Sequence, residues 1–407
     1  MKKYLLTVTA IVMSLVLILF VVGCAGESAA PVAPAAAQEP TPESEPLTEE
    51  SPAVDQEPTP EPEPLSEEPE ERTVTVTDMS GDSVTIIGEV DRIINLWPAG
   101  TASFFALGAG DLIVGIATAG TINEWTQLFY PNSINIPELG GTTPSIEELI
   151  DLEPDLVIIH PATAADGFAQ LIRDVGIPAI NIDFSTYETM AQAYAILAEI
   201  LGGEYQQRLE LWISETEAKI SNARNLTADI SEEERPVVFY IAGQSHSLTT
   251  TMNPGSIVDD WVESAGGRHA TTLMDVAAAD ITPEAIFALN PDIFICAGVW
   301  QHVHMHELLT TPGWMDLNAV VNERVYTNPY GNFNWDRFGL ESQLQINYAL
   351  MIIQPEIASA NGITRESIID DIISFYSTYA GFELTAQQAE HMLDGLSPDG
   401  TMENPVE

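Results

Sequence analysis

The chain has 407 residues, of which 13 are Lys or Arg and 61 are Asp or Glu, so its formal net charge is −48. This length allows two or three domains, and a hydrophobic fraction of 45% excludes a wholly disordered chain. The shortage of cations argues against a nucleic-acid partner, because binding to phosphates requires clustered Lys and Arg. The two cysteines, Cys24 and Cys296, provide neither a disulfide framework nor a zinc-finger spacing.

The N-terminus has the layout of an export signal. Two lysines precede an apolar run over residues 5–22, which ends at Gly23 and Cys24. A cysteine directly after glycine resembles the lipobox of bacterial lipoproteins, which implies a signal peptide over residues 1–23 and acylation of Cys24. The alternative is an uncleaved transmembrane anchor, since the run is long enough to span a bilayer. We predict the lipoprotein, with the rest of the chain outside the cytoplasm and anchored to the cell membrane.

Residues 24–72 are predicted to form a disordered tether. They are rich in Pro, Glu, Ala, Ser and Thr, they repeat the sequence EPTPE at 39–43 and 57–61, and they contain no base before Arg72. Such a segment has little apolar surface to bury and repels itself, so it stays extended. We expect it to act as a spacer between the membrane and a folded body.

The folded body begins with a predicted β-hairpin over residues 73–87, in which alternating residues flank the turn sequence MSGD. Short apolar runs then alternate with helical stretches, which is typical of parallel sheets covered by helices on both faces. The predicted strands form two blocks, on either side of a helical region over 187–226: Arg92–Trp97, Leu112–Ile116, Asp155–His160 and Pro178–Asp183, then Pro236–Ala242, Asp292–Ala297 and Arg324–Thr327.

The two blocks predict an α/β protein with two Rossmann-like lobes joined by one long α-helix. Within the helical region, Tyr205–Ala228 is the predicted connecting helix. The predicted boundaries are an N-terminal lobe over 73–203, the connecting helix over 204–228, a C-terminal lobe over 229–395 and a tail over 396–407.

An internal repeat supports two similar lobes. Residues 145–158 align without a gap with residues 282–295. Each copy begins with a Ser or Thr suited to a helix N-cap, places a Glu (Glu147 or Glu284) at the second helical position, and continues through Pro-Asp into a buried strand. The repeat predicts the same helix–strand corner in two pseudo-symmetric halves that face a ligand cleft.

The order of these motifs resembles the substrate-binding proteins of ABC importers for iron-siderophore, haem and cobalamin. The resemblance spans residues 73–395 and is carried by TVTDMSGDSVTI, PSIEELIDLEPDLVI, GSIVDDWVESAGG, DITPEAIFALNPDIFI, ERVYTNPYGNFNWD and YAGFELTAQQAEHML. It implies ligand capture between two lobes with limited hinge motion and no catalytic step. It also implies that Glu147 and Glu284 dock onto Arg residues of a membrane permease, which works with its ATPase. The alternative for both glutamates is a purely local role at a helix start.

Candidate ligand contacts follow the predicted strands, because ligands of open α/β sheets bind beyond the carboxyl ends of the strands. Aromatic residues and histidines are concentrated there, and they suit a bulky or flat ligand with apolar surface. Trp125 and Phe333 also occupy such positions. The predicted ligand-binding residues are Trp97, His160, Gln244, His246, Trp300, His302, His304, Tyr330, Trp335 and Arg337.

Arg337 has two interpretations. It is expected either to hold an anionic group of the ligand or to form a structural pair with Asp336 or Glu341. Because the body has few cations, the sequence argues against a triply charged catecholate complex and favours a neutral or cationic ligand. We therefore predict capture of an iron- or cobalt-containing chelate of the ferric siderophore, cobalamin or haem type.

The segment His302-Val-His304-Met-His306 leaves further alternatives open. On an extended loop, two or three imidazoles would face one metal ion, with His160 completing the site from the other lobe. On a helix, His302 and His306 would share a face, and a solvated polar loop is the third option. The metal-ligand interpretation makes the protein a receptor for nickel, cobalt or zinc ions.

An extracellular metal-dependent hydrolase is a further alternative, of a different functional class. The sequence lacks an H-E-x-x-H helix, a G-x-S-x-G elbow and a paired carboxylate motif, so a non-enzymatic binding protein is the stronger prediction. Cys296 lies inside an apolar strand and is predicted to be a buried small hydrophobe.

Overall fold

The computed structural model describes residues 71–118, 120, 122–274, 277 and 281–402. The predicted signal peptide (1–23), the predicted acylation site Cys24 and the tether up to residue 70 lie outside these residues. Within them, no helix combines the length and the apolar character needed to cross a membrane. Arg72 attaches the start of the folded part to residues 199 and 200, because its guanidinium donates hydrogen bonds to the carbonyls of Ile200 (2.7 Å) and Glu199 (3.0 Å).

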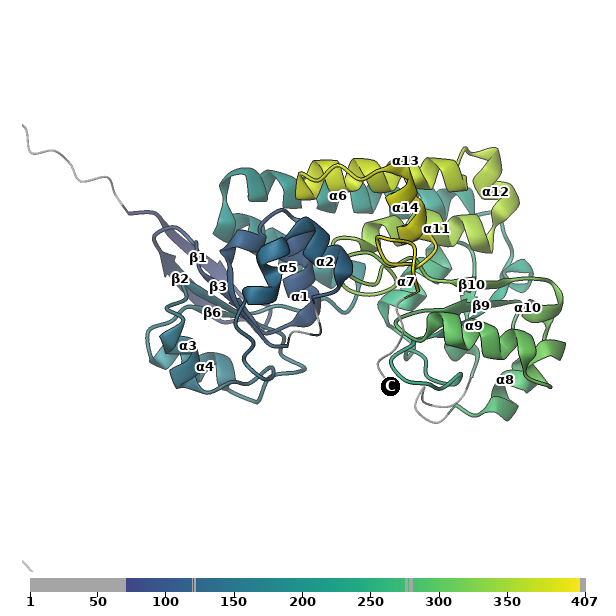
Figure 1. Cartoon of the computed structure of the whole chain (residues 1–407), viewed down its shortest axis with the longest axis horizontal. Helices are drawn as coiled ribbons and strands as arrows, with labels where there is room; N and C mark the ends of the chain where they lie inside the picture. The colour runs from purple at the N-terminus through teal and green to yellow at the C-terminus, as the bar shows by residue number, and fades with distance from the viewer. Residues whose placement is uncertain (1–70, 119, 121, 275–276, 278–280, 403–407) are drawn as a thin grey trace, which may run out of the picture. The chain divides into compact units, whose positions relative to one another are not determined.

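The first lobe contains a β-hairpin and a four-stranded parallel sheet (Figure 1). The hairpin pairs β1 (Thr73–Thr77) with β2 (Ser83–Ile87) in antiparallel register, as predicted. In the sheet order β4-β3-β5-β6, the strands β3 and β5 are central, and all their residues are buried. Because both faces of the sheet are covered, these strands show no alternation of apolar and polar residues. The strands are β3 (Ile93–Asn95), β4 (Ile113–Ile116), β5 (Leu156–Ile159) and β6 (Ala179–Asn181), and the helices are α1 (Pro98–Ala106), α2 (Glu124–Phe129), α3 (Ile146–Asp151) and α4 (Phe168–Asp174).

The second lobe repeats this architecture with the order β10-β9-β7-β8, again with parallel pairing. The edge strand β8 (Arg268–His269) was not among the predicted strands, because two residues are too few to show a periodicity. The fold is therefore α/β with two Rossmann-like lobes. The other elements are β7 (Val237–Ile241), β9 (Ile293–Cys296), β10 (Val325–Thr327), α7 (Ile257–Ser264), α8 (Pro283–Leu289), α9 (Gln301–Thr310) and α10 (Asn318–Val321).

One long helix connects the lobes. After α5 (Tyr187–Leu201), the helix α6 (Gly203–Leu226) contacts α5 on the side of the first lobe and both α7 and α11 (Ser342–Ile353) on the side of the second (Figure 1). Trp212 in the middle of α6 is fully buried, and its Nε1 donates to the carbonyl of Leu340 at 2.7 Å. The predicted connecting helix is thus confirmed, and it begins two residues earlier than Tyr205.

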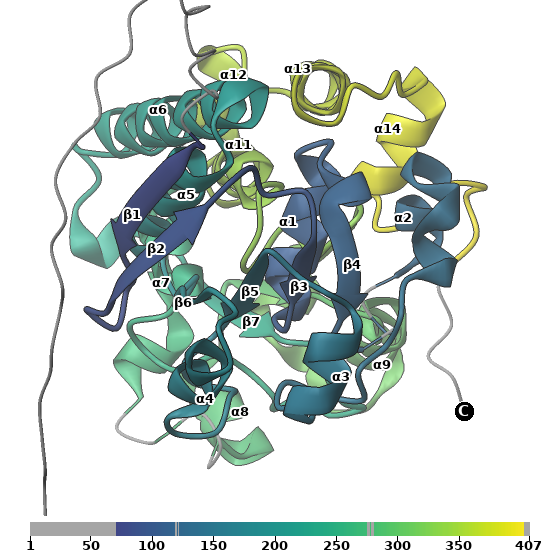
Figure 2. The same cartoon turned by 90° about the vertical axis from the view of Figure 1, so that its left-hand side faces the viewer.

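The C-terminal part of the chain returns to the first lobe instead of staying within the second. The π-helical turn η8 (Tyr376–Ala380) contacts α1, and the Tyr376 ring lies 4.7 Å from the Phe129 ring of α2. Figure 2 shows the C-terminal segment, in yellow, beside α1 and α2. Trp125 in α2 donates through Nε1 to the carbonyl of Leu396 at 3.0 Å, so the first residues of the predicted tail belong to the fold. The remaining helices are α12 (Pro355–Ala360), α13 (Arg365–Phe375) and α14 (Ala386–Leu393).

The two copies of the internal repeat begin and end their helices in the same way. The side chains of Ser145 and Thr282 each accept a hydrogen bond from the backbone N–H three residues later, which caps α3 and α8. After each helix the chain passes through a left-handed residue, Glu153 (φ 45°) or Asn290 (φ 49°). The proline that follows cannot continue a helix, so the chain turns directly into a strand.

The aspartates of the repeat join each corner to the neighbouring central strand. Asp155 accepts a hydrogen bond from the N–H of Arg92 through Oδ2, and Asp292 accepts one from Val237 in the same manner, both at 2.9 Å. Their own N–H groups donate to the carbonyls of the same partners, at 2.8 Å and 2.9 Å. The prediction that both lobes share the same helix–strand corner is confirmed. The Asp of each Pro-Asp has a structural role, since it aligns β5 with β3 in the first lobe and β9 with β7 in the second.

Candidate ligand-binding site

The first lobe brings together Trp97, His160 and Asp183. They follow β3, β5 and β6, which are neighbours in the sheet. The Trp97 and His160 rings are stacked, with centroids 4.1 Å apart, and His160 Nε2 lies 3.4 Å from Asp183 Oδ1. Only 8% of the His160 side chain is exposed. Burial lowers the pKa of His160, and the nearby Asp183 carboxylate partly opposes this effect. The imidazole is therefore neutral at neutral pH.

The second lobe has a similar arrangement around His246. His246 follows β7 and Trp300 follows β9, and these two strands are paired. The two rings stack with centroids 4.8 Å apart, and His246 Nε2 lies 2.9 Å from Glu307 Oε1 on α9. His304 supports this loop, since its Nε2 is 3.1 Å from the Ser245 carbonyl and its ring lies parallel to that of His246. Each lobe therefore carries a stacked Trp–His pair with a carboxylate on the imidazole. We call these the first-lobe cluster (Trp97, His160 and Asp183) and the second-lobe cluster (His246, Trp300 and Glu307).

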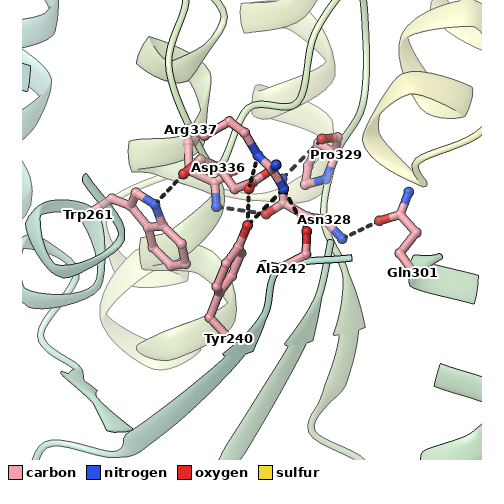
Figure 3. Close-up of polar contacts among 9 residues, drawn as sticks. Tyr240, Ala242, Trp261, Gln301, Asn328, Pro329, Asp336 and Arg337 are labelled. Atoms are coloured by element: carbon pink, nitrogen blue, oxygen red, sulfur yellow. Dashed lines mark hydrogen bonds and ion pairs between the residues drawn. The ribbon is translucent and has the colours of Figure 1, made fainter. Parts of the chain in front are cut away.

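The segment 336–338 connects the carboxyl ends of the two central strands. Arg337 Nη2 donates to the carbonyl of Ala242, directly after β7, at 2.8 Å (Figure 3). The next residue, Phe338, has its ring 6.0 Å from that of Trp97, which follows β3. The two clusters therefore lie at strand ends that share one bridging segment.

A buried polar network holds this segment in place. The Asp336 carboxylate accepts hydrogen bonds from Asn328 Nδ2 (3.1 Å), from Arg337 Nε (3.0 Å) and from the Tyr240 hydroxyl (Figure 3). Its backbone carbonyl accepts from Trp261 Nε1 at 3.0 Å. The Arg337 side chain is only 11% exposed. Of the two interpretations of Arg337, the structure therefore shows the structural pair, with Asp336 and not with Glu341.

Glu341 instead fixes the turn that carries Tyr330 and Phe333. Its carboxylate accepts the N–H groups of Asn332 (2.9 Å) and Phe333 (2.7 Å) and the hydroxyl of Tyr376. Burial raises the pKa of Glu341 to about 7, although these hydrogen bonds act in the opposite direction. From the first lobe, Asn123 Nδ2 donates to the Tyr330 hydroxyl at 2.9 Å. The turn is therefore bound to both lobes.

The structure does not bring the three histidines of the His302–His306 segment together. The segment belongs to the helix α9, so the helical alternative is confirmed, and His302 and His306 lie one turn apart. His302 Nε2 is 3.1 Å from the Gly395 carbonyl, His304 is fully buried, and His306 is exposed. The described residues contain no group of three or more His, Cys, Asp or Glu side chains placed to hold a metal ion. The predicted three-histidine metal site is corrected accordingly, because successive helical positions point in different directions.

Two other predicted aromatic contacts lie in the interior. Trp335 is 0% exposed and Trp125 is 1% exposed, so both pack against protein only. An aromatic residue after a strand is compatible with either a core position or a ligand contact, and only the packing distinguishes them. Gln244 is exposed in the loop after β7. Cys296 is buried as predicted, and burial raises the pKa of its thiol.

Three residues of the site were not predicted from the sequence. Asp183 ends a predicted strand at the same sheet edge, which was a usable signal. Glu307 lies 61 positions after its partner His246, and Phe338 lies 241 positions after Trp97, so no local pattern identifies either residue.

Two glycines allow the loops of the second-lobe cluster to approach each other. Gly243 (φ +62°) follows β7 and Gly298 (φ +69°) follows β9. A Cβ atom on Gly243 would lie 1.5 Å from the carbonyl oxygen of Ala297, a distance that no side chain tolerates without a backbone shift. The stacking of His246 on Trp300 therefore depends on a glycine at 243.

We expect Gly243→Ala to lower the free energy of unfolding by about 3 kcal/mol. An alanine is strained in the left-handed backbone conformation of residue 243, and its Cβ atom would also overlap the carbonyl of Ala297. Gly381→Ala is the matched control, because Gly381 has nearly the same φ (+65°), but no atom lies within 4 Å of the place that its Cβ would take. It should cost about 1 kcal/mol. Urea unfolding followed by circular dichroism measures both, and equal losses would show that the close approach to Ala297 is unimportant.

Comparison with known proteins places this arrangement in a family. The profile of the periplasmic binding protein family matches residues 93–330, more than half of the chain. An uncharacterised ABC transporter substrate-binding lipoprotein of Bacillus subtilis is 26% identical over 258 residues, which cover 62% of this chain and 77% of that protein. A cobalamin-binding protein of Halobacterium salinarum is 22% identical over 228 residues, 54% of this chain and 58% of that protein.

Solved structures share the fold. A periplasmic solute binding protein from Veillonella parvula has a TM-score of 0.67 at 22% identity, over 81% of this chain and 99% of that one. The molybdate periplasmic binding protein MolA of Haemophilus influenzae has a TM-score of 0.64 at 19% identity, over 76% of this chain and 99% of that one. Both neighbours are two-lobed binding proteins. With its paired sheets, its single connecting helix and the match over residues 93–330, this chain belongs to the periplasmic binding protein family.

Proposed function

We propose that the chain is the substrate-binding protein of an ABC importer and that it captures a neutral or cationic metal chelate between its lobes. It is held outside the cytoplasm through acylated Cys24, and residues 24–72 space it from the membrane. Support comes from the family and from relatives whose names specify ABC transport, cobalamin, siderophore and ferric hydroxamate binding. Its role is binding and delivery, with no catalytic step.

The proposed ligand class rests on the hydrogen bonds and ion pairs of the Arg and Lys side chains. Every Arg and Lys of the described residues is already hydrogen-bonded or ion-paired within the protein, many of them to backbone carbonyls. An anionic ligand would therefore meet carboxylates in excess and no uncommitted cation in this part of the chain, which disfavours an oxyanion or a triply charged catecholate complex. The engaged residues are Arg72, Arg92, Arg173, Arg208, Lys219, Arg224, Arg235, Arg268, Arg324, Arg337 and Arg365.

Glu147 and Glu284 are the proposed docking residues for the permease. Both are exposed at the second position of a capped helix, and neither forms an ion pair with another described residue. The neighbouring Glu148 completes the capping box of α3 with Ser145, and the Glu284 carboxylate is hydrogen-bonded to the side chain of Thr282. Figure 1 shows α3 and α8 on the same side of the folded body, opposite α12 and α13. Two exposed carboxylates that form no ion pair with a described residue, on one face of the body, suit an electropositive partner.

Tryptophan fluorescence tests the ligand class. The full-length protein in detergent is titrated with cyanocobalamin, a neutral ferric trihydroxamate, haemin, Ni(II) and a ferric tris-catecholate of charge −3. We expect saturable quenching by at least one neutral or cationic chelate and none by the tris-catecholate, because Trp97 and Trp300 lie at the strand ends.

The combined variant Trp97→Phe/Trp300→Phe should lose most of this signal. Trp314→Phe is the matched control, since the Trp314 ring packs against Phe287 of α8, and it should keep the signal. Tight binding of the tris-catecholate alone would contradict the proposed ligand class.

A further inference from the structure

We infer that a cavity beside the connecting helix is a second binding site, which takes an organic ammonium ion with a short apolar body. The cavity has a volume of about 460 Å³, which is within the range of small-molecule sites. None of its lining residues belongs to the first-lobe or the second-lobe cluster. The inference therefore goes beyond the proposed function and does not depend on it.

Three parts of the fold form the walls of this cavity. The first lobe contributes the first turn of α5, the connecting helix α6 contributes one of its faces, and the second lobe contributes Asp260 of α7. Tyr187 of α5 joins the lobes at this place. Its backbone N–H donates to Asp260 Oδ2 at 3.3 Å, and its hydroxyl donates to the Ser342 carbonyl of α11 at 2.7 Å. A ligand in the cavity would therefore contact both lobes and the helix between them.

The wall formed by α6 offers apolar surface. Ile213 and Ile220 are seven residues apart, which places them on one face of the helix, two turns from each other. Both are only partly buried against the core, and Ala191 of α5 is a further apolar lining residue. Covering the exposed part of these side chains with a hydrocarbon chain or an aromatic ring is favourable, because it removes apolar surface from water.

The charged lining residues determine the sign of the ligand. Glu188 of α5, Glu217 of α6 and Asp260 of α7 are acidic, and among the described residues they face one lining cation, Arg224. The Arg224 side chain already donates through Nε to Ser264 Oγ at 3.1 Å. Carboxylates from all three walls are therefore in excess, which favours a cation and disfavours an anion.

Asp260 is the proposed contact for the ammonium nitrogen. It is half-buried; its Oδ2 accepts the Tyr187 N–H, and no described residue donates to its Oδ1. Burial raises the pKa of Asp260, the Tyr187 N–H and Arg224 oppose this effect, and the Asp259 and Glu188 carboxylates add to it. An ammonium group beside Oδ1 would supply a counter-charge and a hydrogen-bond donor at once.

The test uses three probes that share a phenylethyl group and differ in charge. Phenethylamine is a cation, phenethyl alcohol is neutral and hydrocinnamate is an anion. Each is titrated by calorimetry into the full-length protein in detergent, and the same titration into detergent alone is subtracted. We expect saturable binding of phenethylamine and about tenfold or weaker binding of the other two. Phenethylamine alone should raise the thermal midpoint, since a ligand that binds only the folded state stabilises it.

Variants test the two walls separately. Asp260→Asn should weaken phenethylamine binding about tenfold or more, because it removes the charge while its amide oxygen can still accept the Tyr187 N–H. Ile220→Ser should weaken binding about fivefold through lost apolar surface. Glu263→Gln is the matched control, since Glu263 is exposed one turn after Asp260 in α7 and does not line the cavity, and it should leave binding unchanged. Circular dichroism checks that each variant is folded.

Three results would overturn the inference. Equal binding of the amine, the alcohol and the carboxylate would show that charge plays no part. Absence of saturable amine binding would show that the cavity takes no such ligand. Amine binding by Asp260→Asn as tight as that of wild type would place the site elsewhere in the protein. The chelate titrations are separate experiments, so the proposed function would stand in each case.

Discussion

Reversing the charge of both Glu147 and Glu284 to lysine is expected to reduce importer-coupled transport to the background level while ligand affinity stays within about twofold of wild type. The two carboxylates are exposed, and neither forms an ion pair with a residue of the first-lobe or second-lobe cluster. If the two glutamates dock onto permease arginines as proposed, each reversal would replace an attraction by a repulsion and weaken docking by several kcal/mol.

The fold should tolerate this change. A glutamate in the first turn of a helix contributes about 0.3–1 kcal/mol through the helix dipole, and the caps made by Ser145 and Thr282 remain. Stimulation of permease–ATPase activity in proteoliposomes by the loaded protein, together with its fluorescence titration, measures docking and ligand binding separately.

Glu356→Lys/Glu366→Lys is the matched control for the docking variant. Glu356 and Glu366 occupy the same second position in α12 and α13, they are exposed, and their helices lie on the opposite side of the body (Figure 1). The control carries the same change in net charge. If both double variants stimulate the ATPase equally, the assignment of Glu147 and Glu284 to docking is wrong.

Asp336→Ala is expected to lower the free energy of unfolding by about 3–5 kcal/mol. Asp336 is fully buried and accepts hydrogen bonds from Asn328, Arg337 and Tyr240. Its removal leaves the Arg337 guanidinium, 11% exposed, without its counter-charge. Removing one partner of a buried pair is costly because the remaining charge keeps the desolvation penalty and loses the attraction.

Two further variants identify the cause of this loss. Asp336→Ala/Arg337→Met removes both charges and should recover part of the stability, since no charge is then left unpaired. Asp394→Ala breaks the ion pair with Arg365, in which both side chains are about half exposed, and should cost less than about 1 kcal/mol. Urea unfolding with circular dichroism gives all three values. A loss of less than about 1 kcal/mol for Asp336→Ala would contradict the role of the buried pair.

The architecture was largely predictable because its signals are local. The strands around Ile93–Asn95, Leu156–Ile159 and Ile293–Cys296 are uninterrupted apolar runs, and runs of this length that alternate with helices specify a covered parallel sheet. The repeated corners were equally clear, because caps, prolines and the following aspartates act within a few residues of one another. β8 was missed, since its pairing with β7 depends on a distant partner strand and not on its own two residues.

The candidate site was predictable only as a set of positions. Strand ends identified Trp97, His160, His246 and Trp300, but nothing local shows that Trp97 stacks on His160 or that Glu307 meets His246. The alternating His302–His306 segment was compatible with an extended loop as well as with a helix, and the structure places it in the helix α9.

By itself, then, the sequence determined the two lobes, the connecting helix and the edges of the sheets at which function is expected. Only the tertiary structure decided which imidazoles keep a free nitrogen, which tryptophans are interior, and that Arg337 is bound to Asp336. The physical reason is that backbone preferences depend on neighbouring residues, whereas the partner of a polar atom depends on sheet order and packing between residues far apart in the chain.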